Sequence, residues 1–373
     1  MLALCGTVRT EHALLPFAPL LYHPLLVLSI PFFKKSYFSL PPIDFSRSLP
    51  YNYHNTVKDL LSMKKYLEEF FSLCQYPAEA CTELLCAWDK ISSAEASREI
   101  FEKHIAAYKG APCGKIDFKE MLEDIRRAAK ISGVNTYTAE FLIFCCFTRH
   151  LRRLYAEHSI DDGIWLDSVL DLRYKLYECH AMYGVWGSFV AYWFDKFFTL
   201  ERFALGRLQY EDHLYFCTEE PYTKHSLRLE KNLTPALELH IPSSGKLTEE
   251  SVTDSLKKAY SFFKDSRYMQ NGVLICECSS WLLYPALCDF LPEGSNVVKF
   301  QKCFENTATW QDPYYQDCWR LFNKKYSGTP EDLPRDTSMR RAFAQWLDEG
   351  NTPGCGISLL LFDGEKILTM ESK

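Results

Sequence analysis

The sequence predicts an α+β protein in which an all-helical N-terminal domain precedes a mixed α/β domain. Two observations predict this division. From Met63 to about Phe198, apolar residues recur at three- and four-residue spacing, which is typical of amphipathic helices. After Phe198, short alternating or continuous apolar runs are interspersed with helical stretches, which indicates strands mixed with helices. We therefore expect domains at 63–199 and 200–373, preceded by a leader over 1–62.

Composition and charge exclude several classes of protein. The chain has 373 residues, of which 47% are hydrophobic, and a formal net charge of -6. That charge argues against a nucleic-acid binder that works through a broad basic surface. The 15 cysteines are odd in number and contain no Cys-x-x-Cys pair, so we expect buried reduced thiols, no metal site and a cytoplasmic location.

The leader differs from the rest of the chain. Residues 13–33 are apolar but are interrupted by four prolines and a histidine, which makes a membrane-spanning helix costly. The helical pattern is clear only from Met63, which is itself a candidate translation start. A disordered leader and a membrane anchor are the alternatives, and a membrane partner is expected only if the leader is an anchor.

In the N-terminal half, the apolar spacing predicts seven helices in succession. Their expected ranges are 63–75, 78–90, 94–108, 117–131, 136–158, 165–180 and 185–199. The last of these has a wide aromatic face that includes Trp186, Trp193 and Phe197. Such a face is expected to pack in the core or at a domain interface.

In the second half, strands and helices are expected to alternate. The continuous apolar run 272–278 is typical of a central buried strand, and Asp363-Gly364 is typical of a tight hairpin turn. The other expected strands are 203–211 (continuing toward Cys217), 237–241, 297–304, 357–362 and 366–369. The expected helices begin at Thr248 and near Trp281, and two more cover 313–325 and 338–348.

The segment from Leu239 to Ser251 combines an apolar strand, a turn of small residues and the start of a helix. Thr248 is a suitable helix N-cap, and Leu247 can pack on Val252 as a hydrophobic staple. Backbone N–H groups at such a turn can bind a phosphate. A purely structural turn is the alternative, because Glu249 and Glu250 in the first helical turn would repel an anion.

Three residues nearby are candidates for proton transfer. Glu211 and His240 lie on expected neighbouring strands, and either could take a proton from an attacking amine. Tyr284 follows the central strand and could donate one. The structural alternatives are an ion pair between Glu211 and Arg207, a hydrogen-bonded core histidine, and an ordinary packed tyrosine. A serine or cysteine nucleophile is not favoured, because no Gly-x-Ser-x-Gly motif occurs.

Several segments of the second half occur together in an order that resembles a known family. In chain order they are Leu205–Glu211 (LGRLQYE), Leu239–Leu247 (LHIPSSGKL), Ser280–Leu283 (SWLL), Leu291–Phe300 (LPEGSNVVKF), Cys318–Phe322 (CWRLF), Leu333–Phe343 (LPRDTSMRRAF) and Gly354–Leu360 (GCGISLL). The chain from Met63 onward resembles a bacterial acyltransferase family with a helical N-acyltransferase N-terminal domain and a GNAT-like C-terminal domain.

The resemblance implies a GNAT-like domain with a central, mostly antiparallel sheet and an acyl-CoA donor, with acetyl-CoA as first choice. The pantetheine would lie along Leu239–Ile241, and the pyrophosphate would meet the turn. The implied cofactor-binding residues are Leu239, Ile241, Ser243, Ser244, Gly245, Lys246, Leu247 and Thr248. Ordinary GNAT enzymes have Arg/Gln-x-x-Gly-x-Gly/Ala here, so this turn lacks the second glycine.

The function implied is acyl-CoA-dependent transfer to an amine of a small molecule or peptide. Glu211 and His240 are the candidate bases, and Tyr284 is the candidate proton donor to the thiolate. The alternative function is a non-catalytic GNAT-like binding or partner protein. No nucleic-acid partner and no metal are expected, and the sequence does not indicate an oligomeric state.

Overall fold

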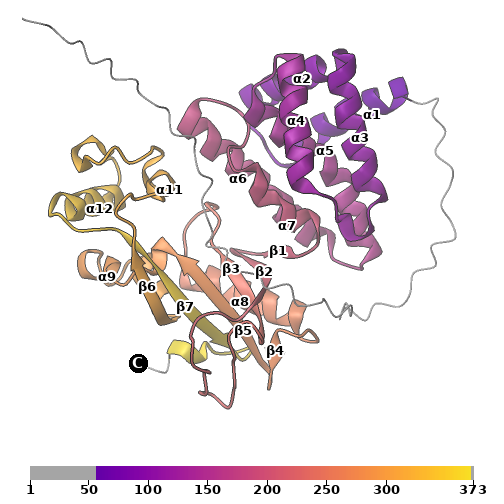
Figure 1. Cartoon of the computed structure of the whole chain (residues 1–373). Coiled ribbons are helices and arrows are strands. Elements are labelled where there is room, and N and C mark those ends of the chain that lie inside the picture. The colour runs from indigo at the N-terminus through magenta and orange to yellow at the C-terminus, as the bar shows by residue number, and fades with distance from the viewer. Residues whose placement is uncertain (1–55, 371–373) are drawn as a thin grey trace, which may run out of the picture. The chain divides into compact units, whose positions relative to one another are not determined.

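The computed structural model describes residues 56–370, so most of the expected leader lies outside the described residues. The N-terminal half is helical, as predicted (Figure 1). Its elements are α1 (Thr56–Leu73), α2 (Ala78–Ser93), α3 (Glu95–Gly110), η2 (Pro112–Gly114), α4 (Phe118–Ser132), α5 (Thr136–Glu157), α6 (Asp162–Tyr183), η3 (Ala191–Phe194) and α7 (Asp195–Phe198). Helix α1 therefore begins seven residues before the expected Met63.

The second half is a mixed sheet with helices, which confirms the predicted α+β class. Its strands are β1 (Arg202–Leu205), β2 (Leu208–Leu214), β3 (Pro235–His240), β4 (Met269–Gln270), β5 (Val273–Ser280), β6 (Glu305–Gln311) and β7 (Gly354–Phe362). The strand order is β1-β2-β3-β5-β7-β6, with β4 paired to β5. Only the β3–β5 pair is parallel, so the sheet is mostly antiparallel.

The helices of this half differ in length and position. They are α8 (Glu249–Phe263), η4 (Trp281–Leu283), α9 (Leu287–Phe290), α10 (Asn296–Gln301), α11 (Cys318–Phe322), η5 (Pro330–Asp332), α12 (Ser338–Asp348) and η6 (Leu368–Met370). Helix α8 covers one face of the sheet, where Leu256 and Leu239 are buried in the same core. On the opposite face, Ile275 and Leu359 belong to a separate apolar cluster.

One hydrophobic core continues from the helices to the α8 side of the sheet. The ring of Phe203 in β1 lies 5.9 Å from Tyr155 of α5 and 5.0 Å from Phe262 of α8. Cys145, Cys146 and Cys276 are fully buried free thiols in this core, as their spacing predicted. The two halves of the described chain are therefore packed through shared apolar contacts.

Two expected elements of regular structure are wrong in kind. The expected helix 185–199 is a loop followed by η3 and α7, because Gly184 ends α6 with a left-handed φ of 65°. Gly187 then packs against α5, where a Cβ would come within 2.5 Å of the Tyr137 backbone. The expected strand 297–304 is mostly helix α10, which Ser295 caps by accepting a hydrogen bond from the Val298 N–H at 3.3 Å.

Three further elements differ in extent. The expected strand 203–211 is the β1–β2 hairpin, which turns at Gly206 with a φ of 78°. The helix expected at 313–325 forms only over α11, and the closing hairpin is reduced to one bridge between Phe362 and Ile367. Strand β6 was not expected. Helix α12 and the central strand β5 confirm their predictions.

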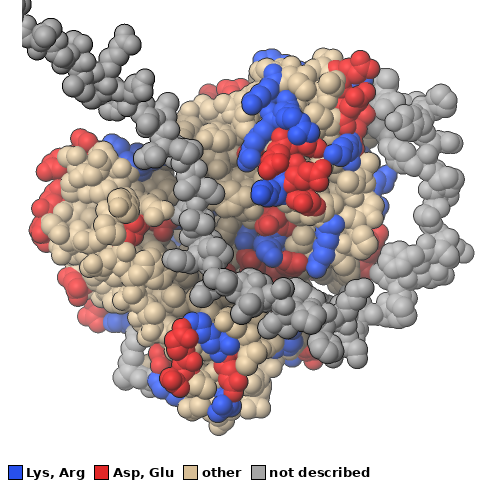
Figure 2. All heavy atoms as spheres, viewed as in Figure 1, with Lys and Arg blue, Asp and Glu red and all other residues tan. Residues whose placement is uncertain are grey.

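Charges are mixed on the face of the molecule shown in Figure 2. Lysine and arginine alternate with aspartate and glutamate over the helical bundle, and neither sign forms a continuous patch there. Among the helices that the structure describes, none has the length and apolar character needed to cross a membrane.

Candidate active site

The face of the sheet opposite α8 gathers polar side chains from β2 and β3. In their antiparallel register, Glu211 is opposite Glu238 and Gln209 is opposite His240. Because side chains alternate along a strand, these four share one face. Leu239 points to the other face, where it is buried in the core. The register therefore brings both predicted bases, Glu211 and His240, to the same place.

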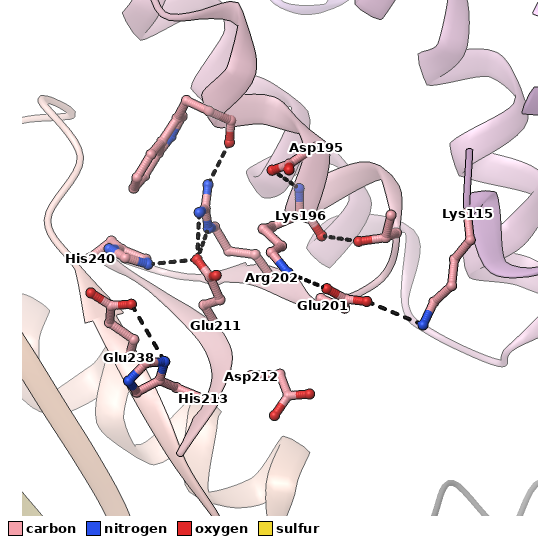
Figure 3. Close-up of polar contacts among 12 residues, drawn as sticks. Lys115, Asp195, Lys196, Glu201, Arg202, Glu211, Asp212, His213, Glu238 and His240 are labelled. Atoms are coloured by element: carbon pink, nitrogen blue, oxygen red, sulfur yellow. Dashed lines mark hydrogen bonds and ion pairs between the residues drawn. The ribbon is translucent and has the colours of Figure 1, made fainter. Parts of the chain in front are cut away.

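Glu211 is held by two cationic or polar partners (Figure 3). Arg202 Nε donates to Glu211 Oε2 at 2.8 Å, and His240 Nε2 lies 2.9 Å from the same oxygen. Burial alone would raise the pKa of Glu211, but the hydrogen bond with His240 and the charge of Arg202 outweigh it and lower the pKa to about 2. The carboxylate is ionised at neutral pH and is consequently a weak base.

His240 ends β3 and keeps one ring nitrogen available. An ionised carboxylate only accepts hydrogen bonds, so the neutral ring presents its Nε2–H to Glu211 and a lone pair on Nδ1. Nδ1 makes no hydrogen bond with the residues that the structure describes, and the side chain is 12% exposed. The pair can therefore act as a base at Nδ1, with Glu211 fixing the tautomer.

Trp193, in the helical half of the chain, contacts both His240 and Arg202 and helps to hold them in place. Its ring contacts His240 edge-on at 4.8 Å, and the Arg202 guanidinium stacks over its face at 3.7 Å. Its indole N–H donates to Asp171 Oδ2 at 3.1 Å, and Asp171 Oδ1 accepts from Gln209 Nε2 at 2.8 Å. Helix α6 and η3 thus fix the position of the histidine on the sheet.

The sequence did not indicate that Arg202, Trp193 and Asp171 belong to this site. The ion-pair partner of Glu211 is Arg202 rather than the expected Arg207. The signal was the hairpin register, which sets Arg202 opposite Glu211 and becomes visible only once Gly206 is recognised as a turn. Trp193 carried no comparable signal, because its neighbours are also aromatic.

Glu211, Glu238 and His240 could in principle hold a metal ion, since their ligand atoms lie within 4.8 Å of one another. In the described structure Arg202 already supplies the positive charge that Glu211 needs. Glu238 lies 3.9 Å from His213 Nδ1. The donor set therefore serves as an ion-pair network, and the Arg202 guanidinium beside it disfavours a cation.

Strands β3 and β5 separate next to His240. They are parallel neighbours for only two residue pairs, Leu237–Cys276 and Glu238–Glu277. Beyond Glu238, no further pair joins these two strands in the part of the chain that the structure describes. Among the described residues, the backbone of 239–240 therefore has no pairing partner on β5.

In the turn between β3 and α8, the backbone N–H groups have no hydrogen-bond partner among the described residues. Thr248 caps α8 by accepting from the Ser251 N–H at 3.2 Å, as predicted. Within the described residues, none of the N–H groups of 243–248 donates a hydrogen bond. Gly245 adopts a φ of 124°, which other residues rarely do. A turn of this kind before a long helix can bind an anion.

The other residues expected in this segment take different positions. Leu239 and Leu247 are buried, Ile241, Ser244 and Thr248 are half-buried, and Ser243, Gly245 and Lys246 are exposed. The Ser243 hydroxyl donates to Glu178 Oε1 at 2.7 Å. Lys299 Nζ lies 2.7 Å from Glu249, so this acidic group, which the sequence suggested would oppose an anion, is paired.

Tyr284 lies in a separate environment. It follows η4, and its ring is so close to Gly354 at the start of β7 that a Cβ there would lie 2.8 Å from it. It packs against the apolar cluster of α9, α11 and α12. Among the described residues, no hydrogen bond or ring contact joins Tyr284 to Glu211 or His240.

A pocket of about 420 Å³ opens beside the turn. It lies between α6 and the turn, and Asn323, which follows α11, also lines it. Its lining residues are Tyr174, Tyr177, Glu178, His180, Ala181, Ser243 and Asn323. Two tyrosine rings and a histidine dominate the wall, and its one carboxylate, Glu178, is paired with Lys175 Nζ at 3.0 Å, so the wall suits an aromatic group.

Comparison with known protein families supports this description of the two halves. Residues 65–200 match the family model of the N-acyltransferase N-terminal domain, and residues 203–360 match that of the GNAT-like C-terminal domain. Among curated proteins, none matches the sequence.

The fold is also found in solved structures at 19% sequence identity. Similar structures include an acyltransferase in complex with decanoyl-CoA and teicoplanin, and one in complex with CoA and 10C-teicoplanin. Each has a TM-score of 0.56 and aligns over 82% of this chain and 95% of the other. An acyltransferase in complex with decanoyl-CoA has the same TM-score over 83% and 95% of the two chains.

Proposed function

Because the chain belongs to the acyltransferases that join an N-acyltransferase N-terminal domain to a GNAT-like C-terminal domain, we propose that it transfers an acyl group from acyl-CoA to an amine. The observation that carries the proposal is the turn at 243–248. Its open N–H groups, the N-terminus of α8 and the gap between β3 and β5 lie together. They suit the pyrophosphate and the extended pantetheine of one ligand.

The donor is proposed to carry a medium-length acyl chain. The sequence resemblance alone implied acetyl-CoA, but the similar solved structures contain decanoyl-CoA. Longer chains are therefore the first donors to test, with acetyl-CoA beside them. Affinity is expected to be on the order of micromolar, as is usual for enzyme substrates.

In the proposed reaction, His240 is the general base and Glu211 its positioning partner. The amine nitrogen attacks the thioester carbonyl carbon while Nδ1 of His240 takes the proton from nitrogen. Backbone N–H groups at the β3–β5 opening stabilise the oxyanion. The carbon–sulfur bond then breaks and the coenzyme leaves as a thiolate. Tyr284 remains the candidate that protonates it, although no observed contact links it to His240.

The acceptor is proposed to enter by the pocket between α6 and the turn. Ser243 in its wall follows His240 by three residues, and Tyr174 in its wall belongs to α6, the helix that also carries Asp171 of the site. The two tyrosine rings in its wall suit an acceptor that carries aromatic groups beside its amine. A small molecule or a peptide could meet both requirements.

The function is tested by thiol release. Purified protein is mixed with acetyl-, octanoyl- or decanoyl-CoA and a panel of amines, and free CoA thiol and the amide product are both quantified. We expect release that depends on the amine and is faster with the longer chains. Binding of acyl-CoA without amine-dependent release across the panel would instead favour a non-catalytic binding protein.

A further inference from the structure

Arg207 contacts the turn at 243–248 through three hydrogen bonds. Its Nη1 donates to the carbonyl of Pro242 at 2.9 Å, its Nη2 to Gly245 at 2.9 Å and its Nε to Lys246 at 3.2 Å. The residue lies in the two-residue turn of the β1–β2 hairpin, far from these partners in sequence. A planar guanidinium can hold three carbonyls at once, whereas a lysine ammonium cannot match this fork.

These bonds determine which way the neighbouring N–H groups point. In a planar trans peptide, the C=O and N–H of one unit point in opposite directions. Fixing the carbonyls of Pro242, Gly245 and Lys246 therefore aims the next N–H groups, those of 243, 246 and 247, away from Arg207. None of these three N–H groups has a partner among the described residues. The three carbonyls of the turn therefore face Arg207, and the N–H groups of 243, 246 and 247 remain available on the opposite side.

The local sequence of the turn at 243–248 does little to fix its backbone conformation. It contains one glycine, Gly245, and no second glycine to relax its backbone. Leu247 is anchored in the core and Thr248 caps α8, whereas 243–246 are held by Arg207 and by two side-chain hydrogen bonds to α6, Ser243 with Glu178 and Ser244 with Tyr174. Arg207 therefore helps to hold the turn in a conformation that the local sequence does not impose.

We propose that Arg207 is a positioning residue for the coenzyme, which holds the turn so that its N–H groups meet the pyrophosphate. The proposal rests on the acyl-CoA function argued above. Arg207 acts from behind the turn, through the backbone, and its carbonyl bonds rather than its charge are what matter. Binding of CoA therefore depends on it, whereas the chemistry at His240 does not.

The test is calorimetric titration of CoA into the wild type and the Arg207→Ala, Arg207→Lys and Arg228→Ala variants. Arg228 is the matched control, since its side chain makes an exposed ion pair with Glu230. We expect Arg207→Ala and Arg207→Lys each to weaken binding by about tenfold or more, since pyrophosphate hydrogen bonds are lost. Arg228→Ala should bind as the wild type does, and kcat at saturating acyl-CoA should change less than twofold in all variants.

The lysine variant separates positioning from charge. If Arg207→Lys binds CoA as tightly as the wild type, the positive charge suffices and the proposal is overturned. Unchanged affinity in Arg207→Ala overturns it as well, while the acyl-CoA function stands. If the wild type itself binds no CoA, the function and the proposal both fail. Should Arg207→Ala not fold, as judged by thermal melting, Arg207→Lys decides the question alone.

Discussion

Glu211 and His240 share one hydrogen bond, and we propose different tasks for them. Glu211 is ionised because Arg202 and His240 both stabilise its charge, so it is better suited to hold the imidazole than to take a proton. His240 retains a basic nitrogen whose orientation is fixed by Glu211 and by the ring of Trp193. At the scale of single residues, the site therefore separates the proposed base from the group that orients it.

Replacing the proposed base should remove most of the activity. We expect His240→Ala to lower kcat by about 10²- to 10⁴-fold, the usual contribution of a general base, with little change in CoA affinity. His213→Ala is the matched control, because His213 lies on the same face of β2 but contacts Glu238 instead. Steady-state thiol release measures both. A kcat for His240→Ala within threefold of the wild type would remove this histidine from the mechanism.

The ion pair at Glu211 should make stability depend on acidic pH. The pKa of Glu211 falls from 4.5 to about 2 on folding, so its stabilisation is complete above pH 4.5 and is lost as pH falls toward 2. The difference corresponds to about 3 kcal/mol. Urea unfolding between pH 7 and pH 2.5 should show a smaller acid loss in Glu211→Gln than in the wild type. Parallel curves for the two proteins would contradict the assignment.

At the scale of elements, features that depend on residues adjacent in sequence were predicted better than features that depend on contacts between distant segments. The Thr248 cap, the start of α8 and the buried strand β5 were predicted because each depends on residues adjacent in sequence. The β1–β2 hairpin was missed because Gly206 was read as part of one alternating strand. Helix α10 was missed because its apolar residues fit an alternating pattern as well as a helical one.

The same distinction applies to the site. Glu211 and His240 could be predicted because they end expected neighbouring strands. Arg202, Trp193 and Asp171 could not, because their contacts arise from the hairpin register and from the packing of α6 and η3 against the sheet. The contact of Arg207 with the turn is of the same kind, and no pattern within either segment indicates it.

The turn between β3 and α8 offers a test at this scale. A Cβ at Gly245 would meet open space, so substitution there costs backbone strain but creates no clash. We expect Gly245→Asp to abolish CoA binding, because it adds a negative charge where the pyrophosphate is proposed to lie. Gly245→Ala controls for the strain and should bind more weakly than the wild type but detectably. Calorimetry measures affinity, and thermal melting confirms folding. Retained affinity in Gly245→Asp would mean that the turn is only structural.

At the scale of the whole molecule, the two family domains share one hydrophobic core. The contact of Phe203 with α5 joins them, and two hydrogen bonds cross the same boundary, from Gln209 to Asp171 and from Arg202 to the carbonyl of Trp193. The helical half therefore does more than line the pocket proposed for the acceptor. It also fixes the proposed base, so catalysis should require both halves in contact.

A shared core predicts that the described part of the chain unfolds as one unit. Phe147→Ala in α5 and Leu360→Ala in β7 both empty fully buried positions, and each should cost about 2–5 kcal/mol. We expect both to lower the midpoint of the same single transition in calorimetric melting. Leu73→Ala, at a position that is 47% exposed, is the control and should change the midpoint little. Two transitions, each sensitive to one substitution only, would show that the halves fold independently.

The measurement that tests the central claim most directly is a crystal structure with decanoyl-CoA, at a ligand concentration that saturates the protein. We predict that the pyrophosphate accepts hydrogen bonds from N–H groups of residues 243–248, and that the pantetheine enters the opening between β3 and β5 with its thioester beside His240. A coenzyme bound at another surface of the protein, with these N–H groups still open, would contradict the account.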